Sequence, residues 1–254
     1  MLLVSDVHGA ATSLRRVADQ GEPVLILGDF LNFVDYRTGE GMVADVLGYE
    51  FSARFAELRA VGDYVASREL WVGAAEQVGD LRELFRGMAV EQYRSMAGAL
   101  EGASGYAIFG NVDIPPLLET ALPSGFEMLH GEAVEIEGRR VGFVGGAMAS
   151  PMVGNTAITE EEMEALLAQL GPVDVLCTHV PPAIDPLRTD VITGRRERAS
   201  RTVLEYVETH QPEWHFFGDV HQPQAQRWTV GRTTCQNLGY FRATGRAFRL
   251  DNAG

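Results

Sequence analysis

Two acidic residues in this chain stand two positions before a histidine, a spacing that can hold a metal ion. They are Asp6, before His8, and Asp219, before His221. In an extended chain, side chains two residues apart leave on the same side of the backbone, so each pair can bind one cation. Carboxylate and imidazole together suit borderline and hard divalent metals. These two pairs are therefore the first candidates for a metal site.

Three further donors follow apolar runs elsewhere in the chain. Asp29 and Asn111 each come after a glycine at the end of such a run, and His179 stands shortly before two prolines. Any one Gly-Asp or Gly-Asn pair is more often a turn than a ligand. Five apolar runs are each followed by a residue of a type that binds metals, which turns alone hardly explain. We therefore interpret these polar residues as one site.

The number of donors favours two ions. Seven donors are too many for one tetrahedral metal. If Asp29 is shared, they divide into two sets of four, and two ions about 3.5 to 4 Å apart form the arrangement used for displacement at phosphorus. The residue types therefore favour hydrolysis of a phosphate ester by two metals. The other three histidines lack ligand spacing, and we expect them outside the site; they are His130, His210 and His215.

The elements that position these residues alternate between strand and helix. Buried strands are predicted at 1–4, 24–27, 106–109, 173–177 and 214–217, and amphipathic helices at 11–18, 160–170 and 200–210. In open α/β sheets the active crevice lies beyond the carboxyl ends of the strands, where all five polar endings fall. A predicted hairpin within 127–146 and strand-like alternation in the tail, 227–250, indicate mixed sheets.

A long segment between the second and third predicted strands, about 41–102, carries no strand signal. Its apolar residues form two helical stripes, one from Val43 to Val65 and one from Val78 to Leu100. We therefore expect a helical hairpin inserted into a single domain that spans residues 1–254. A stripe is more often core than a partner surface. Because two stripes exceed what a hairpin on a sheet edge needs to bury, we also expect a homodimer through this segment.

The composition excludes several classes of protein. The 254 residues are 46% hydrophobic and 22% charged, which is typical of a globular protein, and the net charge is −14. A negative surface repels the backbone of double-stranded DNA, which we exclude as a general partner. No apolar run reaches the roughly 18 residues of a membrane helix, and no signal peptide is recognisable, so we expect no membrane association. The two cysteines stand outside any CxxC pair and fit a cytoplasmic protein.

In their order and spacing, these motifs resemble the pattern of the calcineurin-like metallophosphoesterase superfamily, which is DxH, GDxxD, GNH(D/E), a lone His and GHxH. The matching blocks are Asp6-Val7-His8, Gly28-Asp29-Phe30-Leu31-Asn32, Gly110-Asn111-Val112-Asp113, His179 and Gly218-Asp219-Val220-His221. The resemblance covers most of the chain. It implies an α/β fold, a four-layer α-β-β-α sandwich of two mixed sheets.

The resemblance also implies where two divalent metal ions bind. The first ion would be held by Asp6, His8, Asp29 and His221, and the second by Asp29, Asn111, His179 and Asp219. Asp29 would bridge the two ions, and Asp29 and Asn111 are the expected catalytic residues. We expect Mn²⁺, with Fe, Mg²⁺ or Zn²⁺ as alternatives.

The implied reaction is in-line attack on phosphorus by a hydroxide that bridges the two metals. We therefore expect a metal-dependent phosphodiesterase that acts on a small phosphoester. Cyclic nucleotides, linear phosphodiesters, nucleotide sugars and phosphorylated lipids or proteins all remain open as substrates. Arg195 and Arg196, shortly after His179, are candidates for binding the substrate phosphate, although a charge run of this kind is more often a solvated loop.

Three residues depart from the family pattern. Asn32 replaces the second Asp of GDxxD, Val112 replaces the His of GNH(D/E), and Asp219 replaces the first His of GHxH. Only Asp219 alters a metal ligand. The alternative function is a catalytically weak or inactive binding scaffold with the same fold. Such scaffolds typically lose several ligands, whereas every ligand position here still bears a donor.

Overall fold

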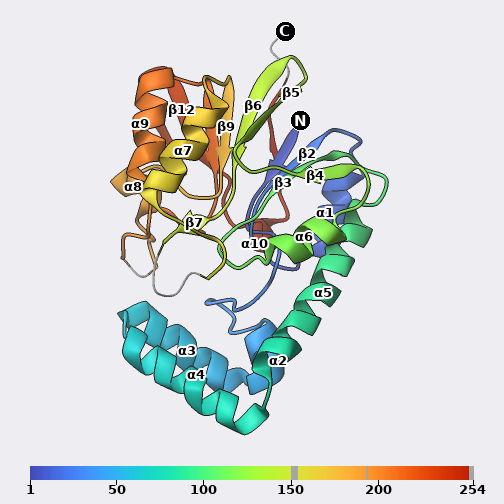
Figure 1. Ribbon diagram of the computed structural model, residues 1–254, viewed down its shortest axis with the longest axis vertical. Helices are drawn as coiled ribbons and strands as arrows, with labels where there is room; N and C mark the ends of the chain where they lie inside the picture. Colours follow the sequence, from blue (N-terminus) through green and yellow to red (C-terminus); the bar gives the residue numbers. More distant parts are fainter. Residues whose placement is uncertain (150–153, 193, 252–254) are drawn as a thin grey trace.

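The computed structural model describes residues 1–149, 154–192 and 194–251 and consists of two sheets packed face to face between helices (Figure 1). The first sheet has the order β13 (Phe248–Arg249), β1 (Leu2–Val4), β2 (Val24–Leu27), β3 (Gly105–Ile108), β4 (Phe126–Met128). The second has the order β11 (Arg227–Val230), β12 (Thr233–Asn237), β10 (Trp214–Phe217), β9 (Val175–Thr178), β6 (Arg139–Val144), β5 (Glu132–Ile136).

Both sheets are mixed, as the sequence predicts. Their central strands run parallel, and antiparallel pairs form at β13–β1, β11–β12 and β5–β6. The β5–β6 pair is the predicted hairpin, and its turn residues Glu137 and Gly138 both have positive φ, which suits a two-residue hairpin loop. A small third sheet pairs β7 (Ala147–Met148) with β8 (Ala157–Ile158). The predicted four-layer α/β sandwich is confirmed.

The layers follow from the alternation of apolar side chains along the buried strands. Successive side chains of a strand point to opposite faces of its sheet. In β2, Val24 and Ile26 share a core with α1 (Ala11–Ala18), α5 (Leu81–Leu100) and α6 (Pro115–Ala121). Leu25 and Leu27 instead pack between the sheets with residues of β6 and β9. The second sheet is covered in the same way by α7 (Glu160–Leu170) and α9 (Arg201–His210).

The parallel register brings the carboxyl ends of the central strands to one edge of the sandwich. In the first sheet Val4 pairs with Ile26, and Ile26 pairs with Ala107. In the second sheet β10 pairs in parallel with both β9 and β12. The chain then returns to the first sheet, because β13 pairs with β1. Donors that follow β1, β2, β3, β9 and β10 therefore emerge at the same edge.

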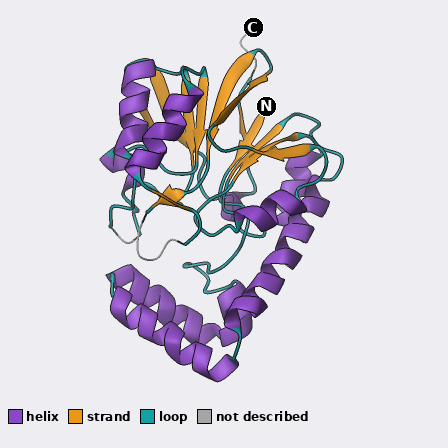
Figure 2. Cartoon of the chain, viewed as in Figure 1, coloured by secondary structure: helices purple, strands orange, loops and turns teal. Residues whose placement is uncertain are grey.

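The insertion between β2 and β3 holds four helices: α2 (Met42–Leu47), α3 (Tyr49–Val61), α4 (Tyr64–Val78) and α5. The first predicted stripe spans α2 and α3 and ends at the start of α4, and the second begins at the end of α4 and spans α5, so the insertion has four helices where the two stripes predict a hairpin. Gly48, Gly62 and Gly79 follow α2, α3 and α4 with positive φ, which glycine adopts at little cost. We call α2, α3 and α4 the cap, and Figure 2 shows it apart from the two sheets.

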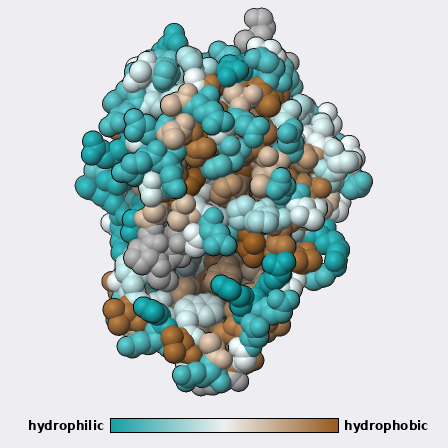
Figure 3. Space-filling model, in the orientation of Figure 1, coloured by the Kyte–Doolittle hydropathy of each residue, from teal (hydrophilic) through white to brown (hydrophobic). Residues whose placement is uncertain are grey.

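The cap leaves several apolar side chains in solvent. Val61, Val65 and Val72 are each more than half exposed, at 76%, 71% and 53%, and Figure 3 shows brown, apolar atoms on this end of the molecule. The second half of α5 is different, since Tyr93, Met96 and Leu100 are buried in the sandwich. A homodimer through the cap stays a prediction. Among the described residues, no helix is long and apolar enough to cross a bilayer.

Trp71 should hold the cap together. Its ring lies 5.4 to 6.0 Å from four phenylalanine rings on the loop before α2, on α3 and on α5: Phe33, Phe51, Phe55 and Phe85. We expect Trp71→Ala to remove about 2 to 3 kcal/mol of packing and to open the cap locally. Limited proteolysis should then cleave the cap at least about 10-fold faster than in the wild type. Trp228→Ala, at an exposed tryptophan of β11, is the control; equal protection of the cap in both variants would contradict this prediction.

His215 should make the fold sensitive to acid. It is fully buried in β10, and burial lowers the pKa of His215 from 6.5 to about 3. The folded state therefore excludes a proton that the unfolded chain binds, so stability is complete above pH 6.5 and falls as the pH drops toward 3. At pH 5.5 the loss from this one residue is about 1.4 kcal/mol. Urea unfolding of His215→Leu at pH 7.5 and 5.5 should show a smaller difference than the wild type; equal differences would contradict it.

Candidate metal centre

The predicted ligands of the first metal lie together at the carboxyl ends of β1, β2 and β10. Asp6, His8, Asp29 and His221 each offer one donor atom, and these atoms all lie within 4.8 Å of one another. Asp6, His8 and Asp29 are buried, whereas His221 is partly exposed. The cluster therefore combines two carboxylates and two imidazoles in a largely buried site.

The predicted ligands of the second metal lie beside this cluster. His179, after β9, places its Nε2 3.5 Å from Asp29 Oδ1 and 3.8 Å from Asp219 Oδ1. Asn111, after β3, donates a hydrogen bond from its Nδ2 to Asp219 Oδ1 at 3.3 Å. Asp29 lies between the two groups, since its other oxygen, Oδ2, is 3.6 Å from His8 Nε2. This position suits a carboxylate shared by two sites.

Four of the seven predicted ligands have an uncommon backbone conformation. Asp6, His8, Asp29 and Asp219 have φ between 41° and 66°, and the only other non-glycine residues with positive φ in the described part of the chain are Glu137 and Gln211. Such conformations cost free energy and concentrate at functional sites. The strand ends are therefore bent in a way that aims these side chains at one another.

Two glycines allow the strand ends to approach closely. Gly28 has φ +88°, and a Cβ on it would lie 2.6 Å from the backbone nitrogen of Gly110 and 2.8 Å from His179 Nδ1. A Cβ on Gly110 would overlap the carboxylate of Asp29. The glycines of the Gly-Asp and Gly-Asn blocks are thus required by the packing around Asp29.

Hydrogen bonds determine which nitrogen His8 and His179 present to the centre. His8 Nδ1 lies 2.7 Å from the carbonyl oxygen of Leu31, and His179 Nδ1 lies 2.7 Å from that of Leu27. A carbonyl oxygen only accepts, so both Nδ1 atoms carry the proton and donate. Both Nε2 atoms therefore face the centre, where their lone pairs can bind a cation, and the carbonyls fix the orientation of the rings.

Several buried polar atoms at the centre have no hydrogen-bond partner. They are both carboxylate oxygens of Asp6, Oδ1 of Asn111 and Nε2 of His179. Buried polar atoms are normally paired, and leaving them unpaired is costly. Every one of these atoms can donate an electron pair to a cation. The residues present therefore fit divalent metal ions, because such ions would satisfy these atoms.

The electrostatics of the centre also favour a cation. Burial raises the pKa of Asp29 to about 8, with further contributions from Asp6 and Asp219, against the opposing effect of His179. Burial would lower the pKa of His179, but the carboxylates of Asp29, Asp219 and Asp6 outweigh it and raise the pKa to about 9. Burial also opposes the ionisation of Asp6, but His221, His179 and His8 outweigh it and lower the pKa of Asp6 to about 2. Asp29 thus resists ionising beside a charged Asp6, and a metal ion would supply positive charge to both.

Asp113 clamps the two strand ends that carry Asp29 and Asn111. Its carboxylate accepts hydrogen bonds from the backbone nitrogens of Asp29, Phe30 and Gly110 at 2.9 to 3.0 Å. It also accepts the hydroxyl hydrogen of Tyr93 on α5 at 3.1 Å. The motif Gly110-Asn111-Val112-Asp113 contains this residue, but the ligand pattern predicts no role for it. Its position two residues after Asn111 was the available signal.

The three departures from the family pattern occupy different places. Asp219 lies beside His179 and Asn111, as a ligand would. Val112 donates its backbone N–H to Asp29 Oδ1 at 3.1 Å, so it supports Asp29 with its main chain. Asn32 is buried at the start of the loop that leads to the cap, and its backbone N–H bonds the side chain of Gln92 on α5.

The two candidate substrate arginines make contacts away from the ligand cluster. Arg195 donates to the carbonyl oxygens of Arg59 and Ala60 at the end of α3, at 3.0 and 2.9 Å. It therefore joins the loop before α9 to the cap. Arg196 pairs with Asp185 at 2.9 Å in an exposed position. A role for either arginine in binding phosphate stays a prediction.

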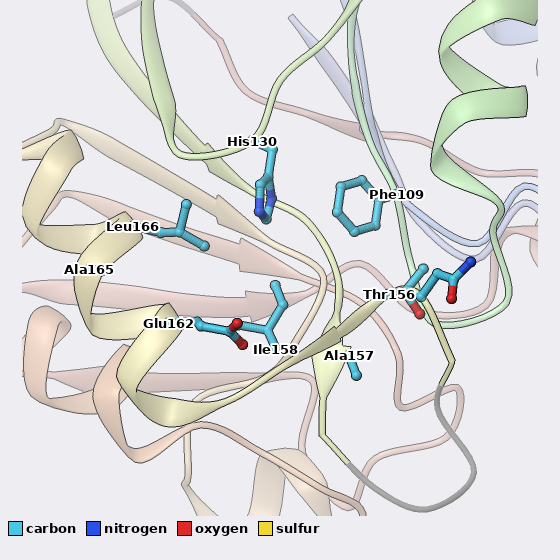
Figure 4. Close-up of a pocket in the computed structure, with 9 residues that line it drawn as sticks. Phe109, His130, Thr156, Ala157, Ile158, Glu162, Ala165 and Leu166 are labelled. Carbon is cyan, nitrogen blue, oxygen red and sulfur yellow. The ribbon is translucent and has the colours of Figure 1, made fainter.

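The remaining histidines lie outside the cluster. Figure 4 shows His130 beside Phe109. Both residues line a cavity of about 360 Å³, and Gly145 donates its backbone N–H to His130 Nδ1. Thr156, on the same cavity, donates its hydroxyl hydrogen to the carbonyl oxygen of Asn111. His215 bonds Thr178 in the second sheet, and His210 packs against the ring of Tyr206. None of the three lies among the described metal-binding donors.

Comparison with known proteins gives one kind of match. No protein-family profile matches the chain, and no curated protein matches it. Among solved structures, the chain is similar to a candidate 5′-nucleotidase from Staphylococcus aureus, determined in complex with alpha-ketoglutarate, at a TM-score of 0.45 and 15% identity. The match covers 94% of this chain and 48% of that one, so the chain spans about half the length of that protein.

Asp29 should matter to both metals. Replacing it with alanine removes a donor from each set, so Asp29→Ala should weaken two bound ions together. Asp6→Ala and Asp219→Ala each remove a donor from one set and should weaken one ion each. Metal analysis of the purified, Mn²⁺-loaded variants gives the number of ions per chain. Two tightly bound ions in Asp29→Ala would contradict the assignment of Asp29 as a ligand of both ions.

Proposed function

We propose that this chain is a metal-dependent phosphoesterase of the calcineurin-like metallophosphoesterase superfamily, and specifically a phosphodiesterase with two divalent metal ions. The observation that carries the proposal is the cluster of Asp6, His8, Asp29 and His221, whose donor atoms lie within 4.8 Å of one another. Unpartnered buried atoms on Asp6, Asn111 and His179 support it. We also propose that the protein acts in the cytoplasm and that its substrate is a small phosphoester.

In this proposal the chain's own residues hold and orient the reacting groups. Bound divalent ions would supply positive charge to the phosphate oxygens and would acidify a water molecule for attack on phosphorus. Asp29 holds the two sets of ligands together, and Asp113 holds the Asp29 loop against the Asn111 loop. The carbonyls of Leu31 and Leu27 keep His8 and His179 aimed at the centre. Chemistry at phosphorus then needs no side-chain nucleophile.

The second set is richer in oxygen donors than the family pattern. Asp29, Asn111 and Asp219 offer oxygen, and His179 offers the one nitrogen. Carboxylate and amide oxygens suit Mn²⁺ or Mg²⁺ relatively better than Zn²⁺, although affinity at any one site still rises along the Irving–Williams order. We therefore propose Mn²⁺ as the working metal, with Fe, Mg²⁺ and Zn²⁺ as alternatives.

Val112 supports a preference for diesters with good leaving groups. The side chain carries no proton to give to a leaving group, and its backbone N–H is bonded to Asp29. Proton transfer by a placed side chain contributes about 10² to 10⁴ in rate. An alkyl leaving group, which needs that proton, should therefore suffer more than a p-nitrophenolate, which leaves as the anion.

Hydrolysis assays test this function. We expect Mn²⁺-loaded protein to hydrolyse bis(p-nitrophenyl) phosphate and EDTA to abolish the activity. Simple alkyl phosphomonoesters should react about 10²-fold more slowly or worse. Val112→His should improve alkyl substrates more than p-nitrophenyl substrates. Equal or faster hydrolysis of alkyl monoesters by the wild type would contradict the diesterase assignment.

The scaffold alternative gives a different result. A binding scaffold with this fold would hold no stoichiometric metal and would hydrolyse no ester in the same assay. The unbroken set of donors at all seven positions argues against it, since a scaffold has no need to retain buried, unpaired ligand atoms.

A further inference from the structure

The ring of Tyr240 lies flat against His221. The two ring centroids are 4.1 Å apart and the planes differ by 8°. Tyr240 also meets His8 edge-on, with centroids 5.6 Å apart. Only 5% of Tyr240 is exposed, so its ring forms a fixed wall behind two proposed ligands of the first metal.

His221 lacks the support that the other two histidine ligands have. His8 and His179 are each oriented by an Nδ1 hydrogen bond to a backbone carbonyl. Within the described residues, the Nδ1 of His221 makes no hydrogen bond, and its Nε2 faces His8 Nε2 at 3.1 Å and Asp6 Oδ1 at 3.3 Å. Metal-binding histidines are normally oriented by a partner on the nitrogen that does not bind the metal. Ring stacking on Tyr240 takes the place of that partner.

Tyr240 is itself held by the loop that leads to the cap. Its hydroxyl donates to Asp35 Oδ2 at 2.8 Å. Asp35 is buried and also accepts the backbone N–H groups of Arg37 and Thr38. The position of Tyr240 therefore depends on the fold of this loop.

Arg242 strengthens the same link. It lies 3.4 Å from Asp35 Oδ2 through its Nε and bonds Glu40, farther along the loop, at 3.0 Å. It also donates to the carbonyl oxygen of His8 at 2.8 Å. One arginine thus contacts both the cap loop and the backbone of a proposed ligand.

We infer that Tyr240 is the positioning residue of His221 and that, through Asp35, it couples the first metal set to the loop that carries the cap. The inference rests on the proposed metal centre. It names a link between the cap and metal binding that the ligand motifs do not contain. Movement of the loop from 33 to 41 would turn His221 away from the other donors, whereas the second set, on His179 and Asn111, would keep its own supports.

Mn²⁺ titration of metal-stripped protein tests the inference. In Tyr240→Leu, which removes the ring, we expect one of two Mn²⁺ ions to bind about 10- to 100-fold more weakly and the other to be unchanged. Tyr240→Phe keeps the ring and loses the bond to Asp35, and should restore most of the affinity. Asp35→Ala should weaken the same ion by a smaller factor, although Asp35 is not a proposed ligand.

Tyr206→Leu is the matched control, because Tyr206 is a buried tyrosine that packs on His210 outside the centre. It should bind both ions as the wild type does. If Tyr240→Leu does not fold, Asp35→Ala decides the question. Two ions bound with wild-type affinity in the folded variants, or the same loss in Tyr206→Leu, would overturn the positioning role alone. A wild-type chain that binds no Mn²⁺ would overturn the proposed metal centre, and this inference with it.

Discussion

The constraint on which the structure depends is the close packing of carboxylates at the end of the sandwich. Asp6 and Asp29 are buried, and Asp219 lies beside them within reach of His179. Burial raises the pKa of Asp29 and of Asp219, and Asp6 raises both further. Both oxygens of Asp6 and one of Asn111 still lack a hydrogen-bond partner, although His221 Nε2 lies 3.3 Å from Asp6 Oδ1. A cation between them would turn a costly arrangement into a stable one.

Much of the fold serves to hold this arrangement. Parallel pairing places the ends of β1, β2 and β3 side by side, and the second sheet brings His179 to within 3.5 Å of Asp29. Asp113 and the close approach at Gly28 fix the loops, and four predicted ligands adopt left-handed backbone conformations that the surrounding bonds must maintain. The stability of the packed layers therefore offsets the free-energy cost of the strained backbone at the site.

The sequence predicts the strands and the outer helices well, because each depends on local pattern. The limits 24–27, 214–217, 11–18 and 160–170 coincide with β2, β10, α1 and α7. The two-residue spacing of Asp6 and His8 predicts a shared site, although the extended backbone assumed for it is wrong, since β1 ends at Val4 and both residues have positive φ. The order of strands within two sheets was less accessible, because the return of β13 to β1 joins opposite ends of the chain.

The supports of the site were also beyond local pattern. Tyr240 stacks on His221, 19 residues earlier in the sequence, and its hydroxyl donates a hydrogen bond to Asp35, 205 residues earlier. Nothing in the neighbourhood of either residue indicates this contact. The four helices of the insertion differ from the two predicted stripes for a related reason, since a periodic pattern continues across the glycine turns that end α2, α3 and α4.

The most direct measurement is anomalous diffraction at the manganese edge from crystals of the wild-type chain grown or soaked in Mn²⁺. The account predicts two anomalous peaks, one among Asp6, His8, Asp29 and His221 and one among Asp29, Asn111, His179 and Asp219. Crystals that show no manganese peak at these residues, with the carboxylates paired instead by protein side chains, would contradict it.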